Sequence, residues 1–79
     1  SKEADIYMQL KDYPKARAGY LKALKLYPEY LPAKINLGWV NYMQGNYAKA
    51  LTIAQEVLTK TQNKYALMLF KQSKAKLNK

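Results

Sequence analysis

Acid–base chemistry in this sequence would depend on five carboxylates, because the chain contains neither histidine nor cysteine. The carboxylates are Glu3, Asp5, Asp12, Glu29 and Glu56, and they are scattered along the chain. Glu3 and Asp5 are two residues apart, a spacing at which helical side chains do not face each other. Nucleophile–base pairs and phosphate-binding glycine loops are also absent from the sequence. We therefore predict that the chain is not an enzyme and has no catalytic residue, metal site or cofactor.

The second chemical feature is a strong excess of positive charge. The net charge is +9, and Arg17 is the only arginine among fourteen basic residues. Lysine commonly keeps a helical surface soluble, whereas arginine binds phosphate better. We therefore expect a solvated basic surface and no specific nucleic-acid partner. A surface that binds an anionic partner stays open as an alternative, and such binding would fall steeply with salt. No apolar run approaches the ~20 residues of a membrane span.

An internal repeat indicates how these residues are positioned. The segment KDYPKARAGYLKAL (11–24) aligns without a gap with GNYAKALTIAQEVL (45–58). Tyr13 then falls on Tyr47 and Ala16 on Ala50. Apolar residues in both segments recur with the period of an α-helix. A repeat of about 34 residues that pairs two helices is typical of a helical solenoid.

Turn and capping signals divide the chain into five predicted helices. We expect them at about 2–10, 13–27, 31–44, 47–61 and 64–77, with short connections that force neighbouring helices to pack antiparallel. Asp12 and Asn46 are good N-cap residues at equivalent repeat positions. The last helix fits its apolar stripe better if it begins one or two residues late, so we expect a lengthened junction near 61–64.

The repeat resembles the tetratricopeptide repeat (TPR). Its matches are Tyr7, Ala16, Tyr20, Ala23, Pro28, Leu37, Gly38, Gly45, Asn46, Tyr47 and Ala50, and its departures are Lys34, Asn41, Ala54 and Gln62. The resemblance implies an all-α fold of antiparallel helix-turn-helix repeats, stacked as a short right-handed superhelical solenoid. We expect one domain over 1–79: an N-terminally incomplete repeat (1–30), a full repeat (31–63) and a capping helix (64–79).

The resemblance also implies a non-catalytic interaction scaffold. First helices of successive repeats would line a concave groove for a protein or peptide, either an extended segment or a helix, of apolar or amphipathic character. The groove residues that it implies here are Asp5, Met8, Gln9, Ile35, Asn36, Trp39, Tyr42, Met43 and Leu69, with Ser73 as an addition. One subset of the family clamps the carboxylate of chaperone tails. Of the clamp pattern only Asn36 is present, while Ser1, Asp5, Ala66 and Phe70 occupy the partner positions, so we predict no such clamp.

Trp39 has two interpretations. As a groove residue it would face the concave side with Ile35 and Tyr42, and Trp39→Ala would abolish binding with little loss of stability. As a core residue its truncation would cost several kcal/mol. Tyr13, Tyr20 and Tyr47 are expected in the core.

Two further alternatives stay open. Two repeats are fewer than the three usually needed for a stable array, so the chain could act structurally or self-assemble as a homo-oligomer. An engineered array would have no native partner. The sequence does not identify a compartment, and the cytoplasm is the expected one.

Overall fold

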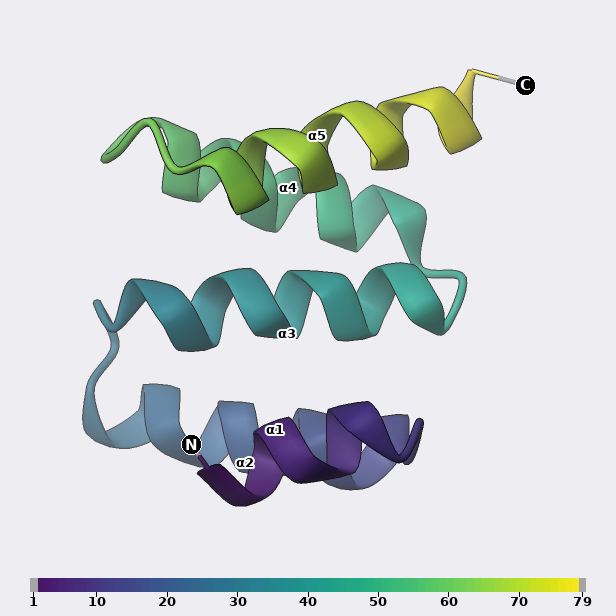
Figure 1. The fold of residues 1–79 in the computed structure, drawn as a ribbon. Helices are drawn as coiled ribbons and strands as arrows, with labels where there is room; N and C mark the ends of the chain where they lie inside the picture. The colour runs from purple at the N-terminus through teal and green to yellow at the C-terminus, as the bar shows by residue number, and fades with distance from the viewer. Residues whose placement is uncertain (1, 79) are drawn as a thin grey trace.

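The computed structural model describes residues 2–78, and this range contains five α-helices and no strand. The helices are α1 (Lys2–Gln9), α2 (Tyr13–Leu26), α3 (Leu31–Met43), α4 (Tyr47–Leu58) and α5 (Lys64–Leu77). Figure 1 shows α1 with α2 at one end of the stack, α3 in the middle, and α4 with α5 at the other end. Each helix packs against the next along the chain, and α3 also contacts α5. The predicted all-helical repeat architecture is confirmed.

The turns that end α1 and α3 have the same geometry. Lys11 and Gly45 occupy equivalent positions of the repeat, and both adopt positive φ, 62° and 86° respectively. In each turn the following amide donates a hydrogen bond of 2.8 Å to the carbonyl five residues earlier. This is a left-handed helix end, which glycine adopts without the steric cost that lysine incurs. The structural repeat therefore extends to the turn itself.

The helix starts differ in how they are capped. The Asp12 carboxylate accepts a 3.4 Å bond from the Lys15 amide at the start of α2. The side chain of Asn63 accepts bonds from two amides at the start of α5, at 2.8 and 3.2 Å. Asn46 occupies the N-cap position of α4, but its side chain makes no capping bond. The positive end of α4 is therefore not neutralised by its cap.

The helix ends correct two expectations. α4 ends at Leu58 rather than near 61, because the amides of Lys60 and Thr61 both donate to the Val57 carbonyl and close a tight turn. The connection 59–63 is one residue longer than the connection 27–30. The lengthened junction and the predicted helix at 64–77 are therefore confirmed. The repeat offset carries the first residue of α3 to Tyr65, however, so relative to that offset α5 begins one residue early at Lys64 rather than late. The helix instead begins early and buries the stripe of Ala66, Leu69 and Ser73, with Lys71, Gln72 and Lys74 exposed.

Small residues let the helices approach closely in the core. One buried cluster joins the first repeat to α3, and it consists of Ala4, Ala16, Tyr20, Ala33 and Val40. Two others join α3, α4 and α5, and they consist of Ile35, Val57 and Ala66, and of Ala50, Ala54 and Leu69. At Gly38 an added Cβ would lie 2.4 Å from Leu69 Cδ2 and 3.1 Å from Ile53 Cγ2. Gly38 is therefore required by packing, as expected for a glycine inside a helix.

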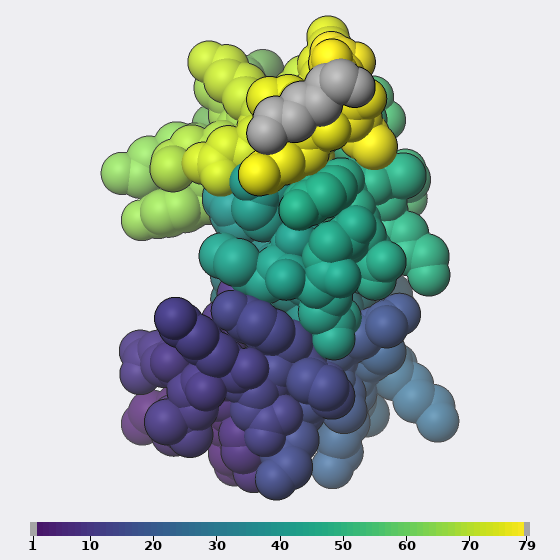
Figure 2. Space-filling model, turned by 90° about the vertical axis from the view of Figure 1, so that its right-hand side faces the viewer, coloured from purple at the N-terminus to yellow at the C-terminus, as the bar shows by residue number. Residues whose placement is uncertain are grey.

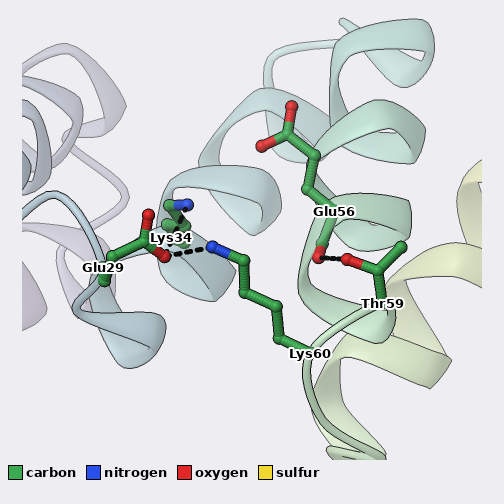
Figure 3. Close-up of polar contacts among 5 residues, drawn as sticks. All are labelled: Glu29, Lys34, Glu56, Thr59 and Lys60. Atoms are coloured by element: carbon green, nitrogen blue, oxygen red, sulfur yellow. Dashed lines mark hydrogen bonds and ion pairs between the residues drawn. The ribbon is translucent and has the colours of Figure 1, made fainter.

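A surface ion-pair network joins two connections of the stack. Glu29, in the α2–α3 connection, accepts a hydrogen bond from Lys60 in the α4–α5 connection (Figure 3). Lys34 on α3 lies 3.7 Å from the same carboxylate. The Lys60 hydrogen bond and the charge of Lys34 lower the pKa of Glu29. Because Glu29 is exposed, this network contributes little to stability.

Candidate protein-binding groove

A groove is lined by residues of α1, of α3 and of the start of α5. Its cavity of about 520 Å³ is lined by Met8, Leu31, Pro32, Ile35, Asn36, Trp39, Asn63 and Tyr65. Apart from two asparagine amides and the tyrosine hydroxyl, these side chains are apolar or aromatic. Among the described residues no charged side chain lines the cavity, although the chain carries a net charge of +9. The groove therefore interrupts the basic surface with a largely neutral, apolar one.

Trp39 belongs to both the core and the groove. Its indole packs against the two buried clusters of α3, α4 and α5, and the residue is half-buried. It also lines the groove cavity. The Trp39 ring meets Tyr42 edge-on at 5.6 Å, and Tyr42 meets Tyr47 in the same manner at 5.2 Å. The two sequence interpretations of Trp39 are therefore not exclusive, and its truncation removes core contacts as well as groove surface.

A buried tyrosine fixes one edge of the groove. Tyr20, only 1% exposed, donates a 2.5 Å hydrogen bond to Asp5 Oδ1. Asn36 Nδ2 approaches the same oxygen at 3.5 Å. Burial raises the pKa of Tyr20, and the bond to the Asp5 carboxylate and its negative charge raise it further. These contacts connect α1 to both α2 and α3. Asp5 therefore helps to position the groove, and the core placement expected for Tyr20 is confirmed.

The structure brings part of the predicted site together. Met8, Ile35, Asn36 and Trp39 line one cavity, although Ile35 is buried, at 5% exposure, and belongs to a core cluster. Asp5 lies beside them through its contact with Asn36.

Other predicted residues lie elsewhere. Gln9 and Met43 are exposed but do not line this cavity, and Tyr42 packs against Trp39. Leu69 and Ser73 are corrections to the predicted groove set: both are fully buried, because α5 turns this stripe into the core against α4. Neither side chain has surface to offer a partner.

Four groove residues were missed by sequence reasoning. Leu31, Pro32, Asn63 and Tyr65 lie at or just before the starts of α3 and α5. The prediction followed the middles of the first helices and overlooked their N-terminal turns. The signal available in the sequence was a tyrosine, Tyr65, two residues after an asparagine at a predicted helix start. In the structure Tyr65 is 55% exposed.

A larger cavity of about 850 Å³ lies on the outer face of α1 and α2, and its lining includes Glu3, Tyr7, Ala18, Leu26, Tyr27 and Tyr30. On α3, Leu37 and Asn41 line a cavity together with Arg17 of α2, which belongs to the preceding repeat. The repeat offset carries Leu37 and Asn41 to Glu3 and Tyr7. This face is therefore the repeat-equivalent of the surface on which α2 packs within the chain. It is an end of the stack and is distinct from the groove.

Across residues 2–78, no three His, Cys, Asp or Glu side chains gather closely enough to hold a metal ion. Every helix in that range falls short of the length and apolarity that crossing a bilayer requires. Of the positions relevant to a chaperone-tail clamp, Ser1 lies outside the described residues, and the absence of a clamp stays a prediction.

Comparison with known proteins identifies the family to which this fold belongs. The family model described as tetratricopeptide repeat matches residues 1–63. The match covers most of the chain, so the chain belongs to the tetratricopeptide repeat family. The search of curated proteins and the search of solved structures each found no significant match. Members of this family generally mediate protein–protein interactions, and TPR repeats are typically non-enzymatic scaffolds.

Proposed function

We propose that this chain is a non-catalytic interaction module whose α1–α3–α5 groove binds an apolar or amphipathic peptide segment. The main supporting observation is the neutral, largely apolar cavity on an otherwise basic protein, lined by Met8, Ile35, Trp39 and Tyr65 among others. Binding there would remove apolar surface from water, which is the main driving force for such association. The amides of Asn36 and Asn63 supply directional contacts to a peptide backbone, in the way that a few polar groups orient ligands in apolar sites.

The test requires variants that spare the core. Trp39→Ala is unsuitable by itself because the indole also packs in the core. Tyr65 is 55% exposed and lines the groove, whereas Tyr30 is 49% exposed and lines the outer face of α1 and α2. Tyr65→Ser and Tyr30→Ser therefore remove the same chemical group, at similar exposure, from two different surfaces.

The ligand for this test is a peptide selected from a random displayed library on the intact chain, with affinity measured by calorimetry. We expect Tyr65→Ser and Asn36→Ala to weaken binding by about tenfold each, the size usual for an interface anchor. Tyr30→Ser should leave affinity within about twofold, with circular dichroism showing all variants folded. Loss of binding in Tyr30→Ser but not in Tyr65→Ser would contradict the groove proposal.

Self-association is a second candidate, favoured by the apolar outer face of α1 and α2. Leu26, Tyr27 and Tyr30 are 68%, 68% and 49% exposed there. Sedimentation equilibrium over a range of concentrations tests it. Association that Tyr27→Ser weakens would support this candidate, and a monomer at every concentration would remove it.

A further inference from the structure

Arg17 has a buried donor that finds no partner within residues 2–78. It lies on α2, it is half-buried, and its Nε atom is buried without an acceptor in that range. The ion pairs of the described residues involve lysines only, and none of their carboxylates pairs with Arg17. Removing a guanidinium N–H from water without an acceptor is unfavourable, because a hydrogen bond to water is lost and not replaced. Within residues 2–78, Arg17 Nε therefore makes no hydrogen bond.

Beside Arg17, the side-chain oxygen of Asn41 accepts no hydrogen bond from the described residues. The residue is 3% exposed near the end of α3, and its Nδ2 donates to the Leu37 carbonyl at 3.0 Å. Its Oδ1 is buried and has no donor among the described residues. Arg17 and Asn41 line one cavity of about 400 Å³ between α2, α3 and α4. An unused donor and an unused acceptor thus belong to the same site.

The rest of the cavity favours negative charge. Its other lining residues are Leu37, Ala48, Lys49, Thr52 and Ile53, so two cations and no carboxylate of the described chain line it. Ala48 and Lys49 lie in the first turn of α4, which has no acidic residue there and no side-chain cap. The positive end of the helix dipole is therefore not neutralised at this site. In Figure 2 the teal atoms of the α3–α4 region meet the dark blue atoms of α2 along a seam on this end of the molecule.

The ligand must accept from Arg17 and Lys49 and donate to Asn41. A water molecule could bridge one donor and one acceptor, but it carries no charge to pair with Arg17 and Lys49. A carboxylate neutralises charge but has no proton to give. A phosphate group in its hydrogen phosphate form has both properties, since its oxygens accept charged hydrogen bonds and its P–OH donates one. We propose that the cavity between α2, α3 and α4 is a binding site for a phosphate group.

The site is specific to this junction of the repeat. The repeat-equivalent positions of Arg17 and Asn41 hold Leu51 and Tyr7, so the donor–acceptor pair is not repeated. Asn41 also stands where the family pattern has tyrosine. The cavity shares no lining residue with the α1–α3–α5 groove. Phosphate binding and peptide binding can therefore succeed or fail independently.

The single arginine makes a direct test practical. In a ¹H–¹⁵N spectrum of the intact chain, the guanidinium Nε–H resonance can come only from Arg17. Inorganic phosphate titrated at constant ionic strength should shift this resonance and the Asn41 side-chain amide, with saturation. Sulfate has the same shape and charge as hydrogen phosphate but lacks its proton. It should bind about tenfold more weakly, the factor expected for one hydrogen bond to a charged group.

Matched variants distinguish phosphate binding in this cavity from general attraction of phosphate to a basic protein. Lys49→Met removes a cation that lines the cavity, and Lys15→Met removes the lysine one repeat earlier, which lies outside it. We expect Lys49→Met to weaken phosphate binding about fivefold or more and Lys15→Met to change it less than twofold. In Asn41→Leu the preference for phosphate over sulfate should disappear.

Three results would overturn the proposal: equal effects of the two lysine variants, an Arg17 resonance that phosphate does not move, or equal affinity for phosphate and sulfate in the unaltered chain. The last would leave an adventitious ion only. If the proposal holds, O-phosphoserine titrated in parallel identifies the source of the group. Affinity similar to that of inorganic phosphate indicates a monoester site, whereas binding of inorganic phosphate alone indicates a site for the free ion.

Discussion

Gly38→Ala tests whether close packing of α3 against α5 limits the choice of side chain. In an unconstrained helix interior the change stabilises by about 1 kcal/mol, because alanine loses less backbone entropy than glycine. Here the added Cβ would lie 2.4 Å from Leu69 Cδ2 and 3.1 Å from Ile53 Cγ2. Leu69 is fully buried, so its methyl group cannot turn into solvent. Overpacking of this kind costs about 1–3 kcal/mol.

The two effects together predict a net destabilisation of about 1 kcal/mol. Urea denaturation followed by circular dichroism measures it, with Ala18→Gly at an exposed position of α2 calibrating the intrinsic preference for alanine. In a Leu69→Ala background the clash with Leu69 Cδ2 is gone and only the milder 3.1 Å approach to Ile53 Cγ2 remains. Gly38→Ala should then stabilise by up to about 1 kcal/mol, giving a coupling of up to about 2 kcal/mol. If Gly38→Ala by itself stabilises the chain by about 1 kcal/mol, the packing argument is refuted.

Three further predictions concern the turns and the polar contacts. Lys11→Gly should stabilise the chain by about 1 kcal/mol in urea denaturation, because it relieves a left-handed conformation (φ 62°) of a residue with a Cβ; an unchanged midpoint would count against this. Tyr20→Phe should destabilise by about 1 kcal/mol, since it removes the donor to Asp5, and the loss should shrink once Asp5→Ala is present. Glu29 should titrate below the ordinary glutamate pKa of about 4.3, because Lys60 stabilises its charged form. This pKa is lower in the folded than in the unfolded chain, so the small stabilisation exists above the unfolded value and is lost as pH falls through the folded one. The pKa of Glu29 is measured from its carboxyl NMR shifts. About 1 M salt should raise this pKa by screening the lysines, and an unchanged pKa in salt would show that the ion pair is absent in solution.

Much of the fold could be predicted because its information is local. The repeat period, the helical spacing of apolar residues and the turn near Gly45 can each be recognised in the sequence without knowing which residues meet in the fold. Helix ends were less accurate, because the end of α4 depends on amides that share the Val57 carbonyl. The bounds of α5 were predicted correctly, but its one-residue displacement from the repeat offset was expected in the opposite direction.

The groove was predictable only to the level of helices. Asp5, Met8, Ile35, Asn36 and Trp39 were placed together correctly as neighbours on first helices. Leu69 was misassigned because helical periodicity shows that a stripe is apolar, but not whether it faces a neighbouring helix or a groove.

The sequence by itself determined a basic, helical tetratricopeptide repeat chain without histidine or cysteine, because composition and period are properties of the chain alone. Only the tertiary structure decided that Trp39 serves two surfaces, and it alone brought Arg17 and Asn41 to one cavity. The physical reason is that burial and the pairing of polar groups depend on residues far apart in the chain. Arg17 and Asn41 lie on different helices, and their buried atoms lack partners only once three helices enclose them both.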